Sequence, residues 1–229
     1  MVVVVVVLVV GVVLLHSPLF EAKVVTVSGK HPNTSTAAIV AAAGLVRHPP
    51  LIDVSPGSTA ARIEALPYIA TARVSRHWPD GVRIAVTERV AAVTMAGPTS
   101  SWSELDATGR TLAVQPARSP GVIVLIVTTP EGPVPPAAIG GSLPSFAQPG
   151  LHVCRTLPLA FSAQVVAVTE AANGTVSVAL NSGLTVLLGT DSDLKQKYED
   201  VAAIIAHASL RGAKTIDVAV PQSPTVSNS

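Results

Sequence analysis

The sequence is poor in aromatic residues and in charge. Only 3% of its 229 residues are aromatic, 13% are charged, and the formal net charge is +1. Because the chain has no broad positive field of the kind that attracts nucleic acid, we expect no nucleic-acid partner. Valine and alanine are abundant instead. This composition favours a core of small and β-branched side chains arranged in thin, strand-rich layers.

Cysteine and catalytic motifs are scarce as well. The single Cys154 excludes an internal disulfide. No glycine-rich phosphate loop follows a strand, and neither His-Glu-x-x-His nor Gly-x-Ser-x-Gly occurs. We therefore predict no enzyme activity, catalytic residue, cofactor or small-molecule substrate. His152 and Cys154 could share a strand face as two metal ligands, but metal sites need three or four. A partly buried cysteine beside a surface histidine, with no metal, is the favoured interpretation.

Long hydrophobic runs are confined to the amino terminus. Residues 1–15 are apolar apart from Gly11, and the first charged residue is Glu21. About 20 residues rising about 1.5 Å each could cross a hydrocarbon layer of roughly 30 Å, and a lone segment in lipid must be helical. The sequence therefore predicts a transmembrane helix over residues 1–20. A cleavable signal peptide is the alternative, but Met1 is followed directly by valine, without a basic region. The missing basic flank also leaves the orientation undetermined by charge.

The next seventy residues have the pattern of a compact β-α-α-β-β domain. Thr34 and its neighbours can cap a helix, and Gly44 can end it. Trp78-Pro79-Asp80-Gly81 has the composition of a tight turn between two strands. Alternation around Ile84 predicts that this hairpin buries one face and exposes the other. The predicted elements are a strand at 22–28, helices at 37–43 and 57–67, and strands at 69–77 and 82–89.

Short strands separated by turn residues dominate the rest of the chain, which is typical of a meandering antiparallel sheet. Asn173-Gly174 is a strong hairpin signal, and Pro221 is expected to end the last strand. Residues 130–149 have no clear period and are left as an irregular connection. The predicted strands are 90–96, 102–105, 110–114, 122–127, 164–169, 175–180, 184–188 and 215–220, with an amphipathic helix at 191–211.

Several motifs follow one another in a specific order after the apolar segment. They include Ser17-Pro-Leu-Phe20, Val25-Thr-Val-Ser-Gly29, Arg76-His-Trp-Pro79, Leu105-Asp-Ala-Thr-Gly109 and Ile216-Asp-Val218. In this order they resemble the FtsQ/DivIB family of bacterial cell division proteins. The resemblance implies an α+β fold with a transmembrane helix at 1–20, a POTRA domain at 21–90, a mostly antiparallel FtsQ-type β domain at 91–220 and a flexible tail at 221–229.

The resemblance also implies a function. It implies a single-pass protein of the cell membrane at the division septum, whose amino terminus lies in the cytoplasm and whose remaining chain lies outside the cytoplasm. Such a protein acts as a divisome scaffold, holding an FtsB/FtsL-like pair at its carboxy-terminal strand. Since a terminal strand has a free edge that a partner strand can pair with, we assign the docking edge to that strand. Its residues are Thr215, Ile216, Asp217, Val218, Ala219 and Val220.

The POTRA domain is implied to recruit other division proteins, and Arg76, Trp78 and Arg83 are the candidate contacts. Two plainer interpretations stay open: the arginines could form a solvated outer face, and Trp78 could be a core residue anchoring the turn. Two other functions also remain. One is a POTRA-containing component of protein secretion or outer-membrane assembly. The other is a membrane-tethered cell-wall hydrolase whose site is not visible in the sequence.

Overall fold

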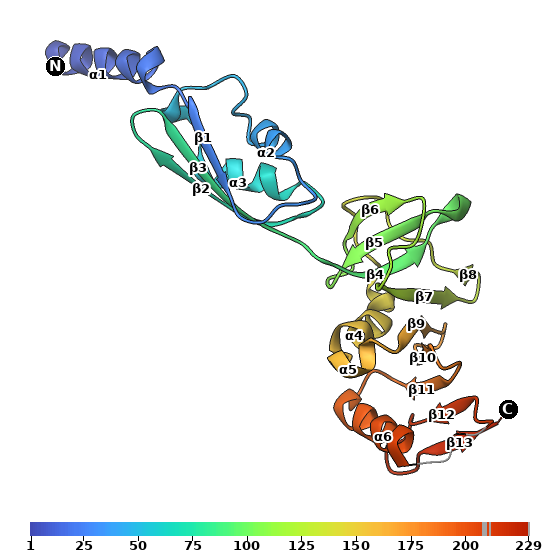
Figure 1. Cartoon of the computed structure of the whole chain (residues 1–229). Helices are drawn as coiled ribbons and strands as arrows, with labels where there is room; N and C mark the ends of the chain where they lie inside the picture. The colour runs from blue at the N-terminus through green and yellow to red at the C-terminus, as the bar shows by residue number, and fades with distance from the viewer. Residues whose placement is uncertain (208–209, 211, 229) are drawn as a thin grey trace. The chain divides into compact units, whose positions relative to one another are not determined.

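The structure is a computed structural model that describes residues 1–207, 210 and 212–228 (Figure 1). It divides into two compact units, Met1–Arg89 and Val90–Ser229, each with a hydrophobic core of its own.

The first unit begins with helix α1, Val2–Leu15, shown in blue in Figure 1. The predicted helix over residues 1–20 is too long, because the chain leaves the helix at His16 and forms a short 3-10 turn, η1, at Pro18–Phe20. Pro18 lacks a backbone N–H and cannot continue the helical ladder. Among the described residues, no helix combines the length and the apolar character needed to cross a membrane.

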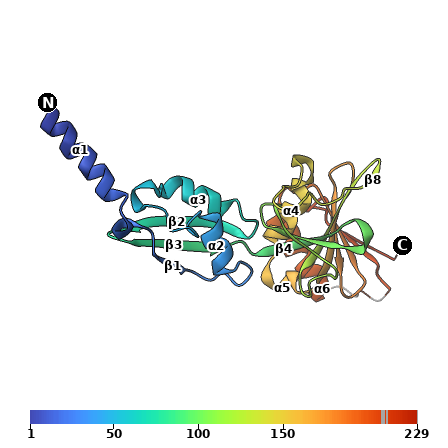
Figure 2. The same ribbon diagram turned by 90° about the horizontal axis from the view of Figure 1, so that it is seen from above.

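The remainder of this unit confirms the predicted β-α-α-β-β order. Its three-stranded sheet has the order β1-β3-β2, with β1 parallel and β2 antiparallel to β3. Both helices lie over one face of the sheet (Figure 2). The elements are β1 Val24–Ser28, α2 Thr36–Ala42, η2 Leu51–Asp53, α3 Pro56–Glu64, β2 Ile69–His77 and β3 Gly81–Glu88.

The alternation predicted for β3 is confirmed. Val82, Ile84 and Val86 are buried against the helices, whereas Arg83 and Ala85 lie on the open face. Buried residues of α2 and α3, among them Ile39 and Ile63, complete the core on the covered side. The open face of the sheet therefore carries polar and charged side chains.

The second unit contains a ten-stranded sheet with the order β13-β12-β11-β10-β9-β7-β4-β5-β6, and β8 pairs with β7. The strands are β4 Ala91–Ala96, β5 Trp102–Asp106, β6 Thr111–Gln115, β7 Ile123–Thr129, β8 Gly132–Pro133, β9 Val165–Glu170, β10 Val176–Leu180, β11 Thr185–Gly189, β12 Thr215–Asp217 and β13 Thr225–Ser227. The helices are α4 Gln148–Thr156, α5 Leu159–Ser162 and α6 Leu194–His207.

The sheet is not a simple antiparallel meander, so that prediction is wrong in part. Strand β7 pairs in parallel with both β4 and β9, and β12 pairs in parallel with β11. Parallel neighbours need a crossover, and here α4 and α5 connect β7 to β9 while α6 connects β11 to β12.

His152 and Cys154 lie on helix α4, so the expectation that they share a strand face is wrong.

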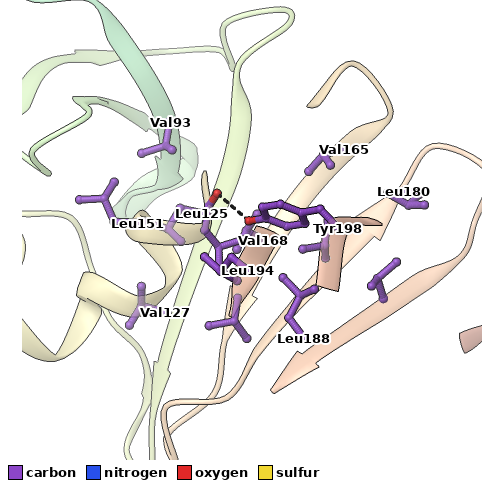
Figure 3. Close-up of a cluster of buried hydrophobic side chains, with 14 of the residues drawn as sticks. Val93, Leu125, Val127, Leu151, Val165, Val168, Leu180, Leu188, Leu194 and Tyr198 are labelled. Carbon is purple, nitrogen blue, oxygen red and sulfur yellow. Dashed lines mark hydrogen bonds between the residues drawn. The ribbon is translucent and has the colours of Figure 1, made fainter. Parts of the chain in front are cut away.

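The core of the second unit lies between the sheet and its helices (Figure 3). The sheet contributes a row of valines and leucines, and α4 and α6 contribute Leu151, Leu194 and Tyr198. Helix α6 begins at Leu194 and not at the predicted residue 191, and its predicted end at residue 211 lies outside the described residues. The apolar spacing of Leu194, Tyr198 and Val201 does face the core.

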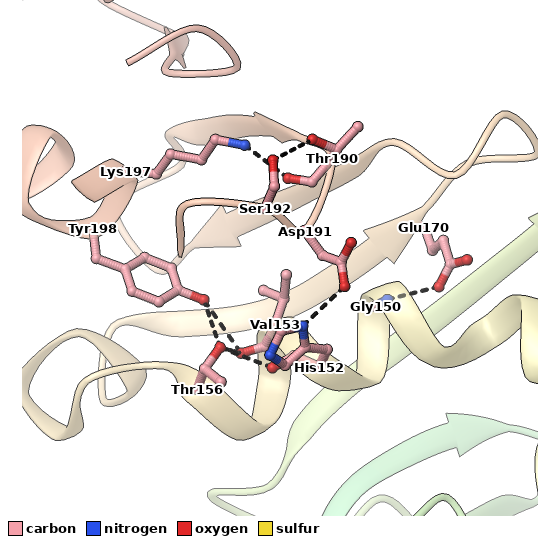
Figure 4. Close-up of polar contacts among 10 residues, drawn as sticks. All are labelled: Gly150, His152, Val153, Thr156, Glu170, Thr190, Asp191, Ser192, Lys197 and Tyr198. Atoms are coloured by element: carbon pink, nitrogen blue, oxygen red, sulfur yellow. Dashed lines mark hydrogen bonds and ion pairs between the residues drawn. The ribbon is translucent and has the colours of Figure 1, made fainter. Parts of the chain in front are cut away.

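A buried carboxylate fixes the start of α4. Glu170, at the end of β9, is 2% exposed, and its Oε2 accepts a hydrogen bond of 2.7 Å from the Gly150 backbone N–H (Figure 4). The first N–H groups of a helix have no partner within it, and a carboxylate there also compensates the helix dipole. Glu170 thus ties the crossover helix to the sheet on which it packs.

Candidate functional site

The predicted docking site is at the carboxy-terminal end of the sheet, and β12 is the strand that contains its first three residues. Its inner side is bonded to β11, with the Thr185 N–H donating to the Lys214 carbonyl at 2.8 Å and the Val218 N–H to the Leu187 carbonyl at 3.0 Å. Ile216 and Val218 are fully buried. They belong to the core, so within β12 only Thr215 and Asp217 point to the other face.

The outer edge of β12 is not free, contrary to our expectation. Strand β13 pairs with it antiparallel, with Thr215 opposite Ser227, Ile216 opposite Val226 and Asp217 opposite Thr225. The resemblance implies a flexible tail at residues 221–229, after the strand that Pro221 is expected to end. In the structure this segment contains a reversal, with the Ser223 N–H donating to the Val220 carbonyl at 3.0 Å, so that β13 returns along β12.

The strand is also shorter than predicted. It ends at Asp217, whose Oδ1 accepts a hydrogen bond of 2.9 Å from the Ala219 N–H and turns the chain out of the ladder. Val220 is 58% exposed and lies beyond the strand. Of the six residues assigned to the docking edge, only Thr215, Ile216 and Asp217 are strand residues.

A cavity of about 660 Å³ opens between α4 and α6, and the sequence did not predict it. His152 on α4 pairs with Asp191 at 2.9 Å, and Tyr198 on α6 bonds to Thr156 at 3.2 Å (Figure 4). The Thr156–Tyr198 contact links α4 to α6, and the His152–Asp191 contact links α4 to the turn that precedes α6. Its walls come from segments about forty positions apart, so no local sequence pattern could have indicated it.

Cys154 on α4 and Lys197 on α6 have shifted pKa values. Burial raises the pKa of the Cys154 thiol to about 12, so the thiol stays protonated and unreactive. Burial lowers the pKa of Lys197, which is 1% exposed and donates to the Thr190 carbonyl at 2.8 Å. Within the described part of the chain, no group of three or more metal-ligating side chains could hold a metal ion.

The second candidate surface is the β2–β3 hairpin of the first unit. The structure brings two of its three predicted residues together, because Trp78 and Arg83 both line a cavity of about 270 Å³. Arg76 lies opposite Val82 on the helix-covered side and donates to the Ile52 carbonyl at 3.3 Å, whereas Arg83 points to the open face. Trp78 sits at the tip, half exposed, and packs edge-on against Phe20. It is therefore not the core residue that one interpretation of the turn required.

Comparisons with known proteins cover both units. A model of the FtsQ-type POTRA domain matches residues 20–89, and a model of the carboxy-terminal region of cell division protein FtsQ/DivIB matches residues 94–219. The cell division protein FtsQ of Mycolicibacterium smegmatis is 28% identical over 216 residues, covering 94% of this chain and 60% of its own length. The FtsQ of Streptomyces collinus is 29% identical over 189 residues, covering 79% of this chain and 68% of its own.

The chain therefore spans about three fifths of the length of the mycobacterial relatives that it matches. Among solved structures, the major extracytoplasmic domain of DivIB from Geobacillus stearothermophilus aligns with 52% of this chain and 93% of that domain, at a TM-score of 0.36 and 16% identity. The FtsQ/DivIB carboxy-terminal model alone matches more than half of the chain, and its match begins at residue 94, shortly after the POTRA match ends at residue 89. On these matches, this chain belongs to the FtsQ/DivIB family of cell division proteins.

Proposed function

We propose that this chain is a non-enzymatic scaffold of the bacterial division complex. The observation that carries the proposal is the succession of an FtsQ-type POTRA match and an FtsQ/DivIB carboxy-terminal match along one chain. The relatives that match most of the chain are named as cell division proteins.

The proposed organisation follows the family. Residues 1–20 anchor the chain in the cell membrane as a single-pass segment with the amino terminus in the cytoplasm. The POTRA domain, 21–90, and the β domain, 91–220, lie outside the cytoplasm at the septum. The exposed apolar side chains of α1, such as Val3 at 74% and Leu8 at 63%, support this anchoring, because such a surface is unfavourable in water.

The β domain is proposed to bind an FtsB/FtsL-like pair at the edge of β12. Main-chain pairing would provide affinity there, and Thr215 and Asp217 would contribute specificity. Because β13 covers this edge, the partner strand must displace Thr225–Ser227 before it can pair. Arg76 and Arg83 remain the candidates for recruitment of other division proteins by the POTRA domain.

A POTRA-containing component of secretion or outer-membrane assembly is the alternative. The match of residues 94–219 to a cell division domain argues against it. Depletion of the protein in its host, followed by complementation with a fluorescent fusion of the full chain, tests the proposal. Depleted cells should form filaments, and the fusion should gather at the septum and restore division. Normal division after depletion, or a fusion spread evenly around the envelope of dividing cells, would contradict a divisome role.

A separate experiment on the purified protein tests the proposal that the chain has no enzyme activity. The full chain in detergent should release no fragments from purified cell wall, with a known hydrolase as the positive control. Wall cleavage by this chain would replace the scaffold proposal with the membrane-tethered hydrolase.

A further inference from the structure

The tip of the β2–β3 hairpin lies beside the segment that follows α1. The rings of Phe20 and Trp78 meet edge-on, with their centroids 5.7 Å apart and their planes at 68°. At the same place the Val24 N–H donates to the Asp80 carbonyl at 3.1 Å. An aromatic contact and a backbone hydrogen bond therefore hold the hairpin tip next to the end of the apolar segment.

This end of the unit exposes large apolar side chains. Leu19 is 74% exposed, Val24 is 55% exposed and Trp78 is 50% exposed, and they continue the exposed apolar surface of α1 along the chain. Phe20 holds one edge of the indole, so Trp78 has a fixed orientation while half of its surface remains uncovered. A single exposed valine would need no explanation, but an ordered tryptophan among other exposed apolar residues indicates a surface that something covers.

The charges around the tip indicate what kind of surface it is. Three cations are balanced by three carboxylates, and one of those carboxylates, Asp53, lies 3.6 Å from His16 at the end of α1. Equal numbers of positive and negative side chains produce no net electrostatic field that would attract a nucleic acid or an acidic peptide. Amphipathic aromatic rings with a polar N–H do suit the headgroup region of a bilayer, where tryptophan is enriched. The charged residues that the contacts place here are Lys23, Arg76, Arg83, Glu21, Asp53 and Asp80.

We propose that the Trp78 indole inserts into the headgroup layer of the membrane, making the hairpin tip a second membrane contact of the POTRA unit. The first contact is α1, and this inference rests on the proposed anchoring of residues 1–20. A single tether leaves a domain free to rotate about it. A second contact beside its base restricts that rotation and presents the open face of the sheet, with Arg83, in a constant direction to its partners.

Tryptophan fluorescence can test this directly because the chain has only two tryptophans, Trp78 and Trp102. The full chain carrying Trp102→Phe is reconstituted into phosphatidylcholine vesicles made with lipids brominated near the headgroup or deep in the acyl chain. The matched control carries Trp78→Phe and reports on Trp102, which lies in β5 of the second unit. We expect Trp78 to be quenched by the shallow bromines several-fold more than Trp102, with a blue-shifted emission.

The possible results separate this inference from the proposed anchoring. Failure of the chain to float with vesicles would contradict the anchoring. Flotation with Trp78 emission unaffected by either brominated lipid would leave the anchoring intact and overturn the insertion, and would favour a protein as the partner of this surface. Equal quenching of the two tryptophans would also overturn it, because the whole chain would then lie on the lipid. If Trp102→Phe disturbs folding by circular dichroism, the difference between the parent and Trp78→Phe gives the same Trp78 signal.

Discussion

Ile216 and Val226 lie directly opposite each other in the antiparallel pair of β12 and β13, yet they differ sharply in burial. Ile216 is fully buried, whereas Val226 is 42% exposed. Strand β12 is thus part of the core, while β13 is attached through three residue pairs and one partly covered side chain. This asymmetry allows β13 to leave without opening the core, which is what displacement by a partner strand requires.

The first prediction follows from this asymmetry. A chain ending at Val220 should stay folded, losing about 1–2 kcal/mol of stability from the β13 hydrogen bonds and the partial burial of Val226. It should bind the partner pair more tightly than the full chain, about tenfold if the uncovered edge is populated about one tenth of the time. Titration of the purified partner by calorimetry measures this. Val226→Thr in the full-length chain, which weakens only the side-chain contact of β13, should give an intermediate affinity.

Weaker binding by the shortened chain would mean that the partner pairs with the outer edge of β13 instead. Equal binding by all three proteins would move the docking site away from this end of the sheet.

A second prediction concerns Ile216 itself. Ile216→Ala should destabilise the chain by about 2–4 kcal/mol because it leaves a cavity in the core. Val220→Ala, at a position 58% exposed and four residues away, is the matched control and should change stability by less than about 0.5 kcal/mol. Urea unfolding of the full chain in detergent compares the two. Similar midpoints for both variants would show that β12 is not built into the core.

Much of the fold could be predicted from local patterns. The alternation in β3, the turn after His77 and the Asn173-Gly174 hairpin each place an element to within a residue or so. These signals are local because side-chain alternation and turn chemistry depend only on neighbouring residues. The order of strands in the large sheet was not predictable in this way. The position of β7 between β4 and β9 is decided by packing between distant segments.

The candidate site shows the same limit. The sequence predicts the strand that contains Ile216, and Pro221 indicates where that strand ends, but neither indicates that the chain returns along it. Pro221 and Pro224 flank a chain reversal, and whether the returning segment pairs with β12 depends on an edge that no local pattern reveals.

The third prediction concerns pH. Burial raises the pKa of Glu170, although the Gly150 N–H opposes this, and the nearby Asp191 charge adds to the rise. The folded chain therefore holds this proton more tightly than the unfolded chain, whose carboxyl titrates near 4.5. Between 4.5 and the raised pKa of the folded state, the folded state binds more protons, so stability contributed by this group falls as the pH rises.

Glu170→Gln has no proton to lose and can still accept the Gly150 hydrogen bond through its amide oxygen. Its stability relative to the parent should therefore increase as the pH rises through that window. Urea midpoints of the two proteins across a pH series measure the difference, and other carboxylates cancel in the comparison. A parent that gains stability over the variant with rising pH would contradict the assignment of a raised pKa.

The last prediction concerns the glycine that follows β1. Gly29 has a φ of +110°, and a Cβ built on it would lie 2.0 Å from the Val86 carbonyl oxygen on the neighbouring strand. Gly29→Ala therefore requires both a strained backbone and a displacement of β3, and should cost roughly 2–4 kcal/mol. Gly57, in helix α3, has open space around its position and no positive φ, so Gly57→Ala is the matched control and should stabilise by up to about 1 kcal/mol. Thermal unfolding followed by circular dichroism compares the variants. A Gly29→Ala protein as stable as the parent would mean that β1 does not approach β3 as closely as the parallel register requires.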